Sequence, residues 1–447
     1  MSSRGKRGKD DSRDDGSRKG KRSGRSRTPR GRKDEQGEDD DQGDMISGSI
    51  LPIIFGFGGF NGPQGEDAGD DGDGWRPKGK MAVLKDRIMK SGMDQKTKDQ
   101  VLIRLKNSND ERTKQLEWFE GLLRIPFGKF ASVPVTVQSD REELNAYFSK
   151  VQSSLDDAVF GMNDVKEEML NYIAQFISSG DKGMPRVLGL QGFPGTGKTA
   201  IIRKGLATAL NRPLSSFSCG GMKDSAFLQG FSFTYSGSRY GRIAQGLMDS
   251  GVMNSIYFFD ELDKIGDNSD GREITNMLIH MTDPSQNFDY EDKYFDGVRI
   301  DLSKIVFVFS YNDSNLINPV LKDRINEIKV PSPSDDEKVI IGTKYLLRDI
   351  CKNIGFQEGD IVCSDEVMRF IIKEYCKNDK GVRPLKQAIE TIVMKLNTAR
   401  YYTQKKYKIL SKDPIKLPYS LTEEVVKELL KKKERDDAML SYPSFYL

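Results

Sequence analysis

The stretch Gly192-Phe-Pro-Gly-Thr-Gly-Lys198-Thr199 follows the pattern G-x-x-x-x-G-K-[ST]. The apolar run Val187 to Leu190 before it predicts a buried strand, and Ala200 to Leu210 after it predict a helix. Glycines let successive backbone N–H groups point at phosphate oxygens, next to the positive end of the helix. Lys198 is placed to reach the β- and γ-phosphates, and the Thr199 hydroxyl to bind Mg²⁺. The sequence therefore predicts a nucleoside triphosphate site made by Gly192, Phe193, Pro194, Gly195, Thr196, Gly197, Lys198 and Thr199.

Composition narrows the class of protein. The 447 residues are enough for two or three domains, and the formal net charge is only +3. The four cysteines, Cys219, Cys351, Cys363 and Cys376, form no CxxC pair, which is typical of reduced thiols inside a cell. A single histidine, His280, argues against a Ser-His-Asp hydrolase or a multi-histidine metal site. No apolar run approaches the roughly 20 residues of a membrane span, and no signal peptide is recognisable, so we expect a cytoplasmic or nuclear protein.

Residues 1–80 have the composition of a disordered segment, because Arg4 to Lys33 is basic and Asp34 to Asp44 is acidic. The basic block is either a nuclear-targeting or nucleic-acid-binding element or a solvated tail. Met45 to Phe60 is an apolar island rich in Gly and Pro, which either docks on a surface or serves as a linker.

From residue 81 the apolar periodicity predicts an α/β protein: a parallel sheet around the phosphate loop, flanked by helices, with a helical segment before it and a helical lid after it. We expect a helical segment at 81–157, a nucleotide-binding domain at 158–330, a lid at 331–432 and a short tail at 433–447. The strands are predicted at Val187 to Leu190, Ile256 to Phe259 and Ile305 to Phe309. The helices are predicted at 81–91, 95–105, 111–123, 141–158, 164–178, 200–210, 335–350, 364–376, 383–401 and 421–433.

Polar side chains follow two of these strands. Asp260 and Glu261 end the first, at the edge where open α/β sheets place ligands. Asp260 is predicted to hold Mg²⁺ and Glu261 to polarise the attacking water, while Asn312 after the next strand orients that water. Arg324 is placed to face a neighbouring subunit, and Arg383 opens a lid helix. For Asn312 and Arg324 alone, a turn asparagine and a surface ion pair remain alternatives.

This order of motifs resembles the AAA+ ATPases, and the segments between them resemble Lon. The resemblance spans about 84–432 and includes Ser218-Cys-Gly-Gly-Met222, Asp260-Glu-Leu-Asp-Lys264, Asp283-Pro-Ser-Gln-Asn287, Ile125-Pro-Phe-Gly128 and Val165-Lys166-Glu167. It implies that Asn312 is sensor 1, Arg324 an arginine finger acting in trans, and Arg383 sensor 2. It also implies an adenine pocket at Phe160 and Gly161.

The same resemblance implies a substrate pore in a homo-oligomer, a hexameric ring. Tyr235 would grip a polypeptide in the first pore loop, where Ser236 replaces an aliphatic residue, and Gly266 to Arg272 would form the second pore loop. No segment with the Ser-Lys dyad of Lon peptidases follows the lid, so we expect an ATP-driven, Mg²⁺-dependent protein unfoldase that is not itself a peptidase. A nucleic-acid remodeller and an assembly ATPase working with a separate protease are the alternatives. Phe445-Tyr-Leu447 resembles a peptidase-docking tail or is a frayed terminus.

Overall fold

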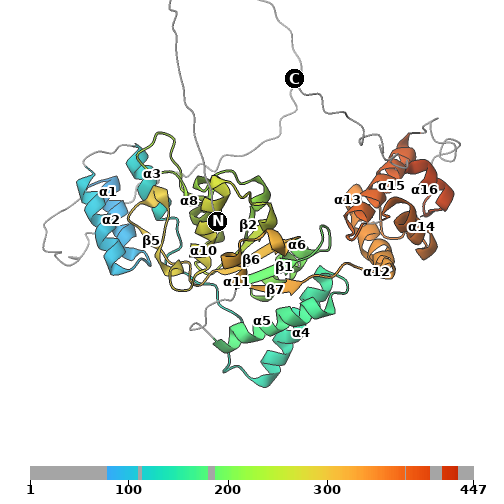
Figure 1. The fold of residues 1–447 in the computed structure, drawn as a ribbon, viewed down its shortest axis with the longest axis horizontal. Helices are drawn as coiled ribbons and strands as arrows, with labels where there is room; N and C mark the ends of the chain where they lie inside the picture. The colour runs from blue at the N-terminus through green and yellow to red at the C-terminus, as the bar shows by residue number, and fades with distance from the viewer. Residues whose placement is uncertain (1–77, 109–112, 180–186, 378, 403–414, 431–447) are drawn as a thin grey trace, which may run out of the picture. The chain divides into compact units, whose positions relative to one another are not determined.

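Five parallel strands form the central sheet of the computed structural model, in the order β2-β3-β6-β1-β7 (Figure 1). The strands are β1 (Val187–Gln191), β2 (Leu214–Ser218), β3 (Ile256–Asp260), β6 (Val306–Tyr311) and β7 (Ile325–Lys329). The phosphate-loop strand β1 lies between β6 and β7, and β6 lies between β1 and β3. The predicted α/β fold, with helices before and after the sheet, is confirmed.

Alternation along the strands divides their side chains between two cores. Ile256 and Phe258 of β3 belong to a core shared with α4 (Arg141–Ala158) and α5 (Asn163–Ser179). Tyr257 and Phe259 belong to a core on the other face, shared with α9 (Arg242–Ser250) and α10 (Ser269–Thr282). Both faces of the sheet are therefore covered, as continuous apolar strands require. Figure 1 shows α4 and α5 on the opposite side of the sheet from α8 (Ala226–Gln229) and α10.

The helix after the phosphate loop lies on the α4 side of the sheet. It consists of α6 (Lys198–Ala200), a π-helical turn (Ile201–Leu206) and α7 (Ala207–Ala209). Ile201, Ile202 and Leu206 are fully buried in the core with α4. The N-terminus of this helix is consequently held against the carboxyl edge of the sheet.

The first three helices of the described chain pack on the core that α9 and α10 share with the sheet. They are α1 (Lys80–Lys90), α2 (Gln95–Asn107) and α3 (Thr113–Leu122). Asp94 caps α2 by accepting a hydrogen bond from the Thr97 N–H. Trp118 and Phe119 of α3 are buried in that core, and the Trp118 indole donates to the Tyr294 carbonyl oxygen.

The C-terminal helices have a core of their own, built around residues such as Met368, Ile371 and Val393. They are α12 (Asp335–Ile340), a π-helical turn (Ile341–Leu346), α13 (Leu347–Ile354), α14 (Asp365–Tyr375), α15 (Arg383–Tyr401) and α16 (Glu423–Leu429). The short parallel strands β8 (Ile361–Val362) and β9 (Tyr419–Ser420) accompany them. A capping box at Ser334 and Glu337 begins α12.

Several elements were not predicted, and one expectation was wrong. The unpredicted elements are β2, β7, β8, β9, α8, α9, α10, α11 (Pro319–Asp323) and the hairpin of β4 (Tyr290–Glu291) with β5 (Arg299–Ile300). The expected second pore loop, Gly266 to Arg272, ends early because α10 begins at Ser269. Asn268 caps that helix by accepting a hydrogen bond from the Gly271 N–H.

The structure describes residues 78–108, 113–179, 187–377, 379–402 and 415–430, all within the unit Asp71–Leu447. The predicted tail at 1–80, apart from its last three residues, lies outside this part, as do the apolar island at 45–60 and the C-terminal segment at 431–447. The domain boundaries stay predictions. No helix in the described ranges combines the length and the apolar character needed to cross a membrane.

Candidate active site

The phosphate loop connects β1 to α6, and its lysine is folded back onto the loop. The Lys198 ammonium donates to the carbonyl oxygens of Gly192, at 2.5 Å, and Phe193, at 3.1 Å. It also donates to Oδ1 of Asn312 at 3.0 Å, although 114 residues separate the two in the chain. Lys198 is only 8% exposed. Burial lowers the pKa of its ammonium, and the carboxylates of Asp260 and Asp263 oppose that shift.

Asp260 is the last residue of β3, and it faces α6, the helix that follows the phosphate loop. Its Oδ2 is 3.5 Å from the Thr199 hydroxyl, and its Oδ1 accepts a hydrogen bond from the Ser310 hydroxyl. The register explains the second contact: Phe259 pairs with Phe309, so the next residues along the two strands are Asp260 and Ser310. The sheet thus brings the Ser310 hydroxyl and the Asp260 carboxylate together, on the face that is covered by α6, the helix of Thr199.

Glu261 follows Asp260 in a conformation that few residues other than glycine adopt. Its φ is 61° and its ψ is 45°, in the left-handed region. Backbone strain of this kind costs of the order of 1–3 kcal/mol and gathers at functional sites. A Cβ added at Gly220 would stand 2.5 Å from Oε2 of Glu261, so this glycine leaves room for the carboxylate. Asp260 is thus the last residue of the strand, and Glu261 occupies the turn that follows it.

Asp263, which the sequence reasoning did not assign, is a buried carboxylate beside these groups. It is 6% exposed, and its Oδ2 accepts a hydrogen bond from the Asp313 N–H at 3.4 Å. Its Oδ1 has no hydrogen-bond partner among the described residues. Asp263 therefore connects the turn after β3 to the turn after β6, where Asn312 lies.

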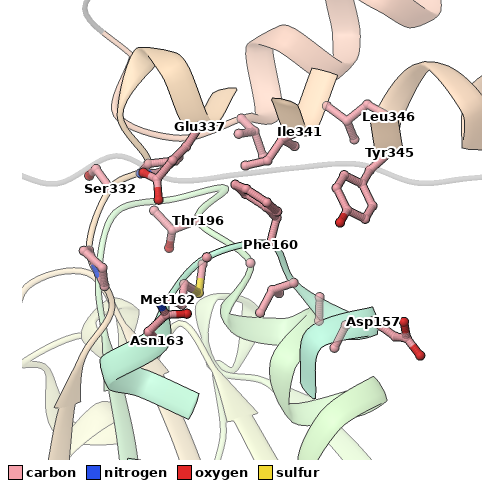
Figure 2. A pocket seen from close by; sticks show the side chains of 18 of the residues that line it. Asp157, Phe160, Met162, Asn163, Thr196, Ser332, Glu337, Ile341, Tyr345 and Leu346 are labelled. Atoms are coloured by element: carbon pink, nitrogen blue, oxygen red, sulfur yellow. The ribbon is translucent and has the colours of Figure 1, made fainter. Parts of the chain in front are cut away.

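A cavity of about 540 Å³ opens beside the phosphate loop (Figure 2). Phe160 and Gly161, the expected adenine contacts, line it from the segment between α4 and α5, opposite Thr196 of the loop. The C-terminal helices contribute Ile341 and Tyr345, and the rings of Phe160 and Tyr345 lie 5.9 Å apart. This volume is within the range of small-molecule sites, which are mostly apolar with a few polar groups.

The C-terminal helices contact the phosphate loop directly. The Val382 N–H donates to the Gly195 carbonyl oxygen at 3.0 Å, and the Lys380 ammonium lies 4.0 Å from the centre of the Phe193 ring. A Cβ at Gly381 would stand 2.1 Å from the Pro194 carbonyl oxygen, so only glycine fits without a shift. Arg383, the predicted sensor 2, is exposed at the start of α15 and packs its backbone against Gly195.

Arg324 is held within its own chain. It follows α11, and its guanidinium forms an ion pair with Asp283 at 3.0 Å and donates to the Ile279 carbonyl oxygen at 3.3 Å. The Ser285 hydroxyl and N–H, together with Arg324, lower the pKa of Asp283 to about 2. The side chain of Arg324 nevertheless remains 26% exposed.

Tyr235 lies in the loop between α8 and α9, and its side chain is 68% exposed. Ser236 beside it is exposed as well. The Lys114 ammonium of α3 donates to the Tyr235 carbonyl oxygen at 2.6 Å.

The structure brings most of the predicted catalytic residues to one edge of the sheet. Lys198 meets Asn312, Thr199 meets Asp260, and Glu261 follows directly. The reasoning from sequence missed Ser310, Asp263, Lys380 and Tyr345. Ser310 was recoverable from alternation, since it lies two residues before Asn312 at the end of a buried strand, but the others depend on contacts distant in the chain.

These residues fit a nucleoside triphosphate with Mg²⁺. A threonine hydroxyl within 3.5 Å of a carboxylate is a donor set that Mg²⁺ prefers, and Lys198 supplies a charge for phosphate oxygens. The glycine-rich loop at the N-terminus of α6 offers backbone N–H groups to the phosphates.

Comparison with known proteins defines the class. The model of the ATPase family associated with various cellular activities (AAA) matches residues 188–332. This range contains the phosphate loop, Asp260, Glu261, Asn312 and Arg324. Residues 188–332 therefore match an AAA ATPase domain.

Within that class, the chain is related to the Lon proteases over the ATPase region. It is 40% identical over 257 residues to a Lon protease homolog of Acanthamoeba polyphaga mimivirus, covering 57% of this chain and 25% of that protein. It is 32% identical over 319 residues to the human mitochondrial Lon protease homolog, covering 71% and 30%. The Lon protease of Brucella suis is 31% identical over 348 residues, covering 76% and 40%.

The chain thus spans between a quarter and two fifths of the length of these relatives. Among solved structures, a closed-state reconstruction of Hsp104 with ATPγS and FITC casein has a TM-score of 0.47 at 18% identity, covering 60% of this chain and 50% of that one.

Proposed function

We propose that this chain is an ATP-driven motor that works as a homo-oligomeric ring and pulls on polypeptides. The observation that carries the proposal is the shared edge of the sheet, where Lys198, Asn312, Thr199, Asp260 and Glu261 meet beside a 540 Å³ cavity. The similarity to the ATPase region of Lon proteases supports the polypeptide as substrate.

In this proposal Phe160, Gly161 and Tyr345 receive the adenine ring, and the loop from Gly192 to Thr199 binds the phosphates. Thr199 and Asp260 hold Mg²⁺, which supplies positive charge toward the phosphoryl oxygens when bound. Lys198 leaves its carbonyl partners to contact the β- and γ-phosphates, since charge-assisted contacts to phosphate are stronger than those to a carbonyl. Asp260 keeps its orientation because Ser310 donates to its other oxygen.

Glu261 and Asn312 act on the attacking water. The Glu261 carboxylate accepts a hydrogen bond from that water, and Glu261 occupies the left-handed turn directly after the Mg²⁺ ligand Asp260. The Asn312 amide orients the same water once Lys198 has turned to the phosphates. Both groups act by position, because phosphoryl transfer requires little covalent chemistry from the protein.

Arg324 acts on a neighbouring subunit, as an arginine finger. In the single chain its guanidinium is bound to Asp283, and Arg324 directly precedes β7, whose first residue pairs with Val187 at the amino end of β1. Arg324 therefore lies at the opposite edge of the sheet from Asp260, which ends β3. A ring of identical subunits, a hexamer in our proposal, places each Arg324 at the nucleotide of the next subunit. Arg383 and Gly381 transmit the nucleotide state to the C-terminal helices, through their contacts with Gly195 and Pro194.

Tyr235 is the proposed contact with the polypeptide. It is an exposed aromatic side chain on a loop, and Ser236 beside it adds little apolar surface. Aromatic rings contact extended chains without regard to sequence, which suits a motor that acts on many substrates.

The test is ATP turnover of the full chain, measured with an unfolded polypeptide, a folded protein, DNA and RNA in parallel. We expect the unfolded polypeptide to raise turnover several-fold and Tyr235→Ala to abolish that rise. Tyr402→Ala is the matched control, because Tyr402 is 66% exposed on the C-terminal helices. Stimulation by DNA or RNA and not by polypeptide would instead support a nucleic-acid remodeller, and would overturn the proposed substrate.

A further inference from the structure

The loop that carries Tyr235 is closed at its base by its own backbone. We define the gripping loop as residues 231–240, between α8 and α9. The Phe231 N–H donates to the Arg239 carbonyl oxygen at 3.0 Å, so the two ends of the gripping loop lie together. Beyond this point, the next residue, Gly241, donates its N–H to the buried carboxylate of Asp292 at 2.7 Å. The base is therefore anchored, whereas its tip extends beyond it.

The tip of the gripping loop is held by helices from the N-terminal part of the chain. Lys114 of α3 contacts two residues of the loop: its ammonium donates to the Tyr235 carbonyl oxygen at 2.6 Å and lies 4.7 Å from the centre of the Phe233 ring. Arg104 of α2 approaches the same ring at 5.2 Å and lies 4.0 Å over the Trp118 ring. Cations over aromatic rings are attracted by the charge on the ring face.

The other partner of Phe233 is the segment that follows Asp292. The rings of Phe233 and Tyr294 lie 5.6 Å apart in an edge-to-face arrangement. The Trp118 indole donates to the Tyr294 carbonyl oxygen at 2.8 Å, and Trp118 itself is buried. Phe233, which lies two positions before the exposed Tyr235, is thus enclosed by α2, α3 and Tyr294.

A third contact ties the far end of the gripping loop to α3. Arg124, just after α3, donates to the Tyr240 hydroxyl at 3.1 Å, and the Tyr240 ring stacks on Phe295 at 5.6 Å. The contacts of Lys114, Arg104 and Arg124 hold the backbone and the flanking rings, but none involves the Tyr235 ring, which stays 68% exposed. The arrangement restrains the gripping loop while leaving its exposed ring accessible.

We propose that the N-terminal helices α2 and α3 are the support of the gripping loop, with Lys114 as the positioning residue that fixes Tyr235. The inference rests on the proposed function, because it assigns α2 and α3 a part in moving polypeptide. A loop that exerts force must transmit the displacement of the body to its tip. If its backbone is free, it bends instead, and the ATP hydrolysed is no longer coupled to movement of the substrate.

The experiment compares Lys114→Met with Lys114→Arg in the full chain. Methionine keeps a similar length and apolar stem but removes the donor and the charge, whereas arginine retains both. We expect the ratio of polypeptide-stimulated to unstimulated ATP turnover to fall about tenfold in Lys114→Met and to be largely retained in Lys114→Arg. The KM for polypeptide should rise in Lys114→Met, while the KM for ATP stays within about twofold.

Lys90→Met is the matched control. Lys90 lies on α1 and pairs with Asp86 at 2.9 Å, so its loss removes a lysine of the same helical segment that does not support the gripping loop. Phe233→Leu is the second variant, since it removes the ring that Lys114, Arg104 and Tyr294 enclose and keeps an apolar side chain. It decides the question if Lys114→Met does not fold, and it should lower the same ratio.

The outcomes separate the inference from the proposed function. If polypeptide does not stimulate the parent chain, and Tyr235→Ala changes nothing, the proposed function fails. If polypeptide stimulates the parent and Tyr235→Ala abolishes the effect, but Lys114→Met and Phe233→Leu both keep the full ratio, the support role is overturned and the function stands. A ratio that falls equally in Lys90→Met also overturns it, because the effect would then be general to the helices.

Discussion

The nucleotide edge of the sheet and the gripping loop are held in place by different forces. Asp260 ends β3 and Asn312 follows β6, and the apolar residues of both strands are buried on both faces, so hydrogen bonds of the ladder and two cores fix them. The gripping loop has no strand within it, and its tip is held by Lys114, Arg104 and a few aromatic rings. Half-exposed contacts of this kind contribute far less than burial of a strand.

The comparison teaches that the two regions should respond differently to substitution. A change at the nucleotide edge should alter chemistry without loosening the fold, since the sheet holds the position. A change near the gripping loop should alter coupling, because a few contacts from another part of the chain set the backbone. The four predictions below follow from this difference, in decreasing order of effect.

The largest effect is expected where the nucleotide edge needs a second chain. Glu261→Gln and Arg324→Ala should each lower ATP turnover by about a thousandfold, because each removes one half of a site shared by two subunits. A mixture of the two variants should recover turnover, since about a quarter of the interfaces then combine an intact Glu261 with an intact Arg324. Turnover of the separate and mixed proteins is the measurement. Complete absence of recovery after subunit exchange contradicts a finger that acts in trans.

The second prediction concerns Asp292, which anchors the base of the gripping loop. This carboxylate is fully buried, and burial raises its pKa to about 7, although the N–H groups of Gly241, Tyr294 and Phe295 oppose the shift. The folded state thus binds the proton of Asp292 more tightly than the unfolded state does. The resulting contribution of Asp292 to the free energy of unfolding is complete below pH 4 and is lost as the pH rises through 7. Its size is at most about 4 kcal/mol.

Asp292→Asn is expected to remove this pH dependence, because asparagine does not titrate. Unfolding midpoints of the parent and the variant, compared at pH 5 and pH 8, provide the measurement. The parent should lose more stability than the variant between the two values. Equal losses in the two proteins contradict the assignment, whatever the overall stability of the variant.

The third prediction tests the junction between the phosphate loop and the C-terminal helices. A methyl group at Gly381 would stand 2.1 Å from the Pro194 carbonyl oxygen, so Gly381→Ala must displace one of the two segments. Misplacement of this size near reacting groups costs about ten- to a hundredfold in rate. Turnover and ATP affinity should both fall, while the unfolding midpoint changes little. Unchanged turnover would show that the two segments move apart without consequence.

The smallest effect is expected for substitutions at the N-caps of two helices, α2 and α4. Asp94 accepts hydrogen bonds from the Thr97 N–H and hydroxyl and begins α2, the helix that carries Arg104, whereas Asp140 begins α4 without a side-chain capping bond. Asp94→Ala should lower the free energy of unfolding by about 1 kcal/mol, and Asp140→Ala should lower it clearly less. Chemical denaturation of both variants is the check. A larger loss in Asp140→Ala would reverse the expected order.

Local pattern was enough to predict most helices and the strands that carry the site. The helix predicted at 141–158 is α4, and the helix predicted at 383–401 is α15, because amphipathic periodicity and helix ends are short-range properties. β7 was missed because only Ile325 and Ile328 of its five residues are buried, as suits an edge strand. α10 was missed because its first turn, with Ser269 and Gly271, reads as a polar loop.

The sequence by itself determined the phosphate loop, the carboxylates after β3 and the order of the motifs. Backbone geometry near glycines and the period of buried strands are encoded within a few residues, and that is why local pattern was enough to make these predictions. Only the tertiary structure decided that Lys198 contacts Asn312, that Ser310 holds Asp260 and that Arg324 pairs with Asp283. It also brought Lys114 to Tyr235, 121 residues away. Contacts of this kind depend on strand order and on how separate helices pack, and no local pattern records either.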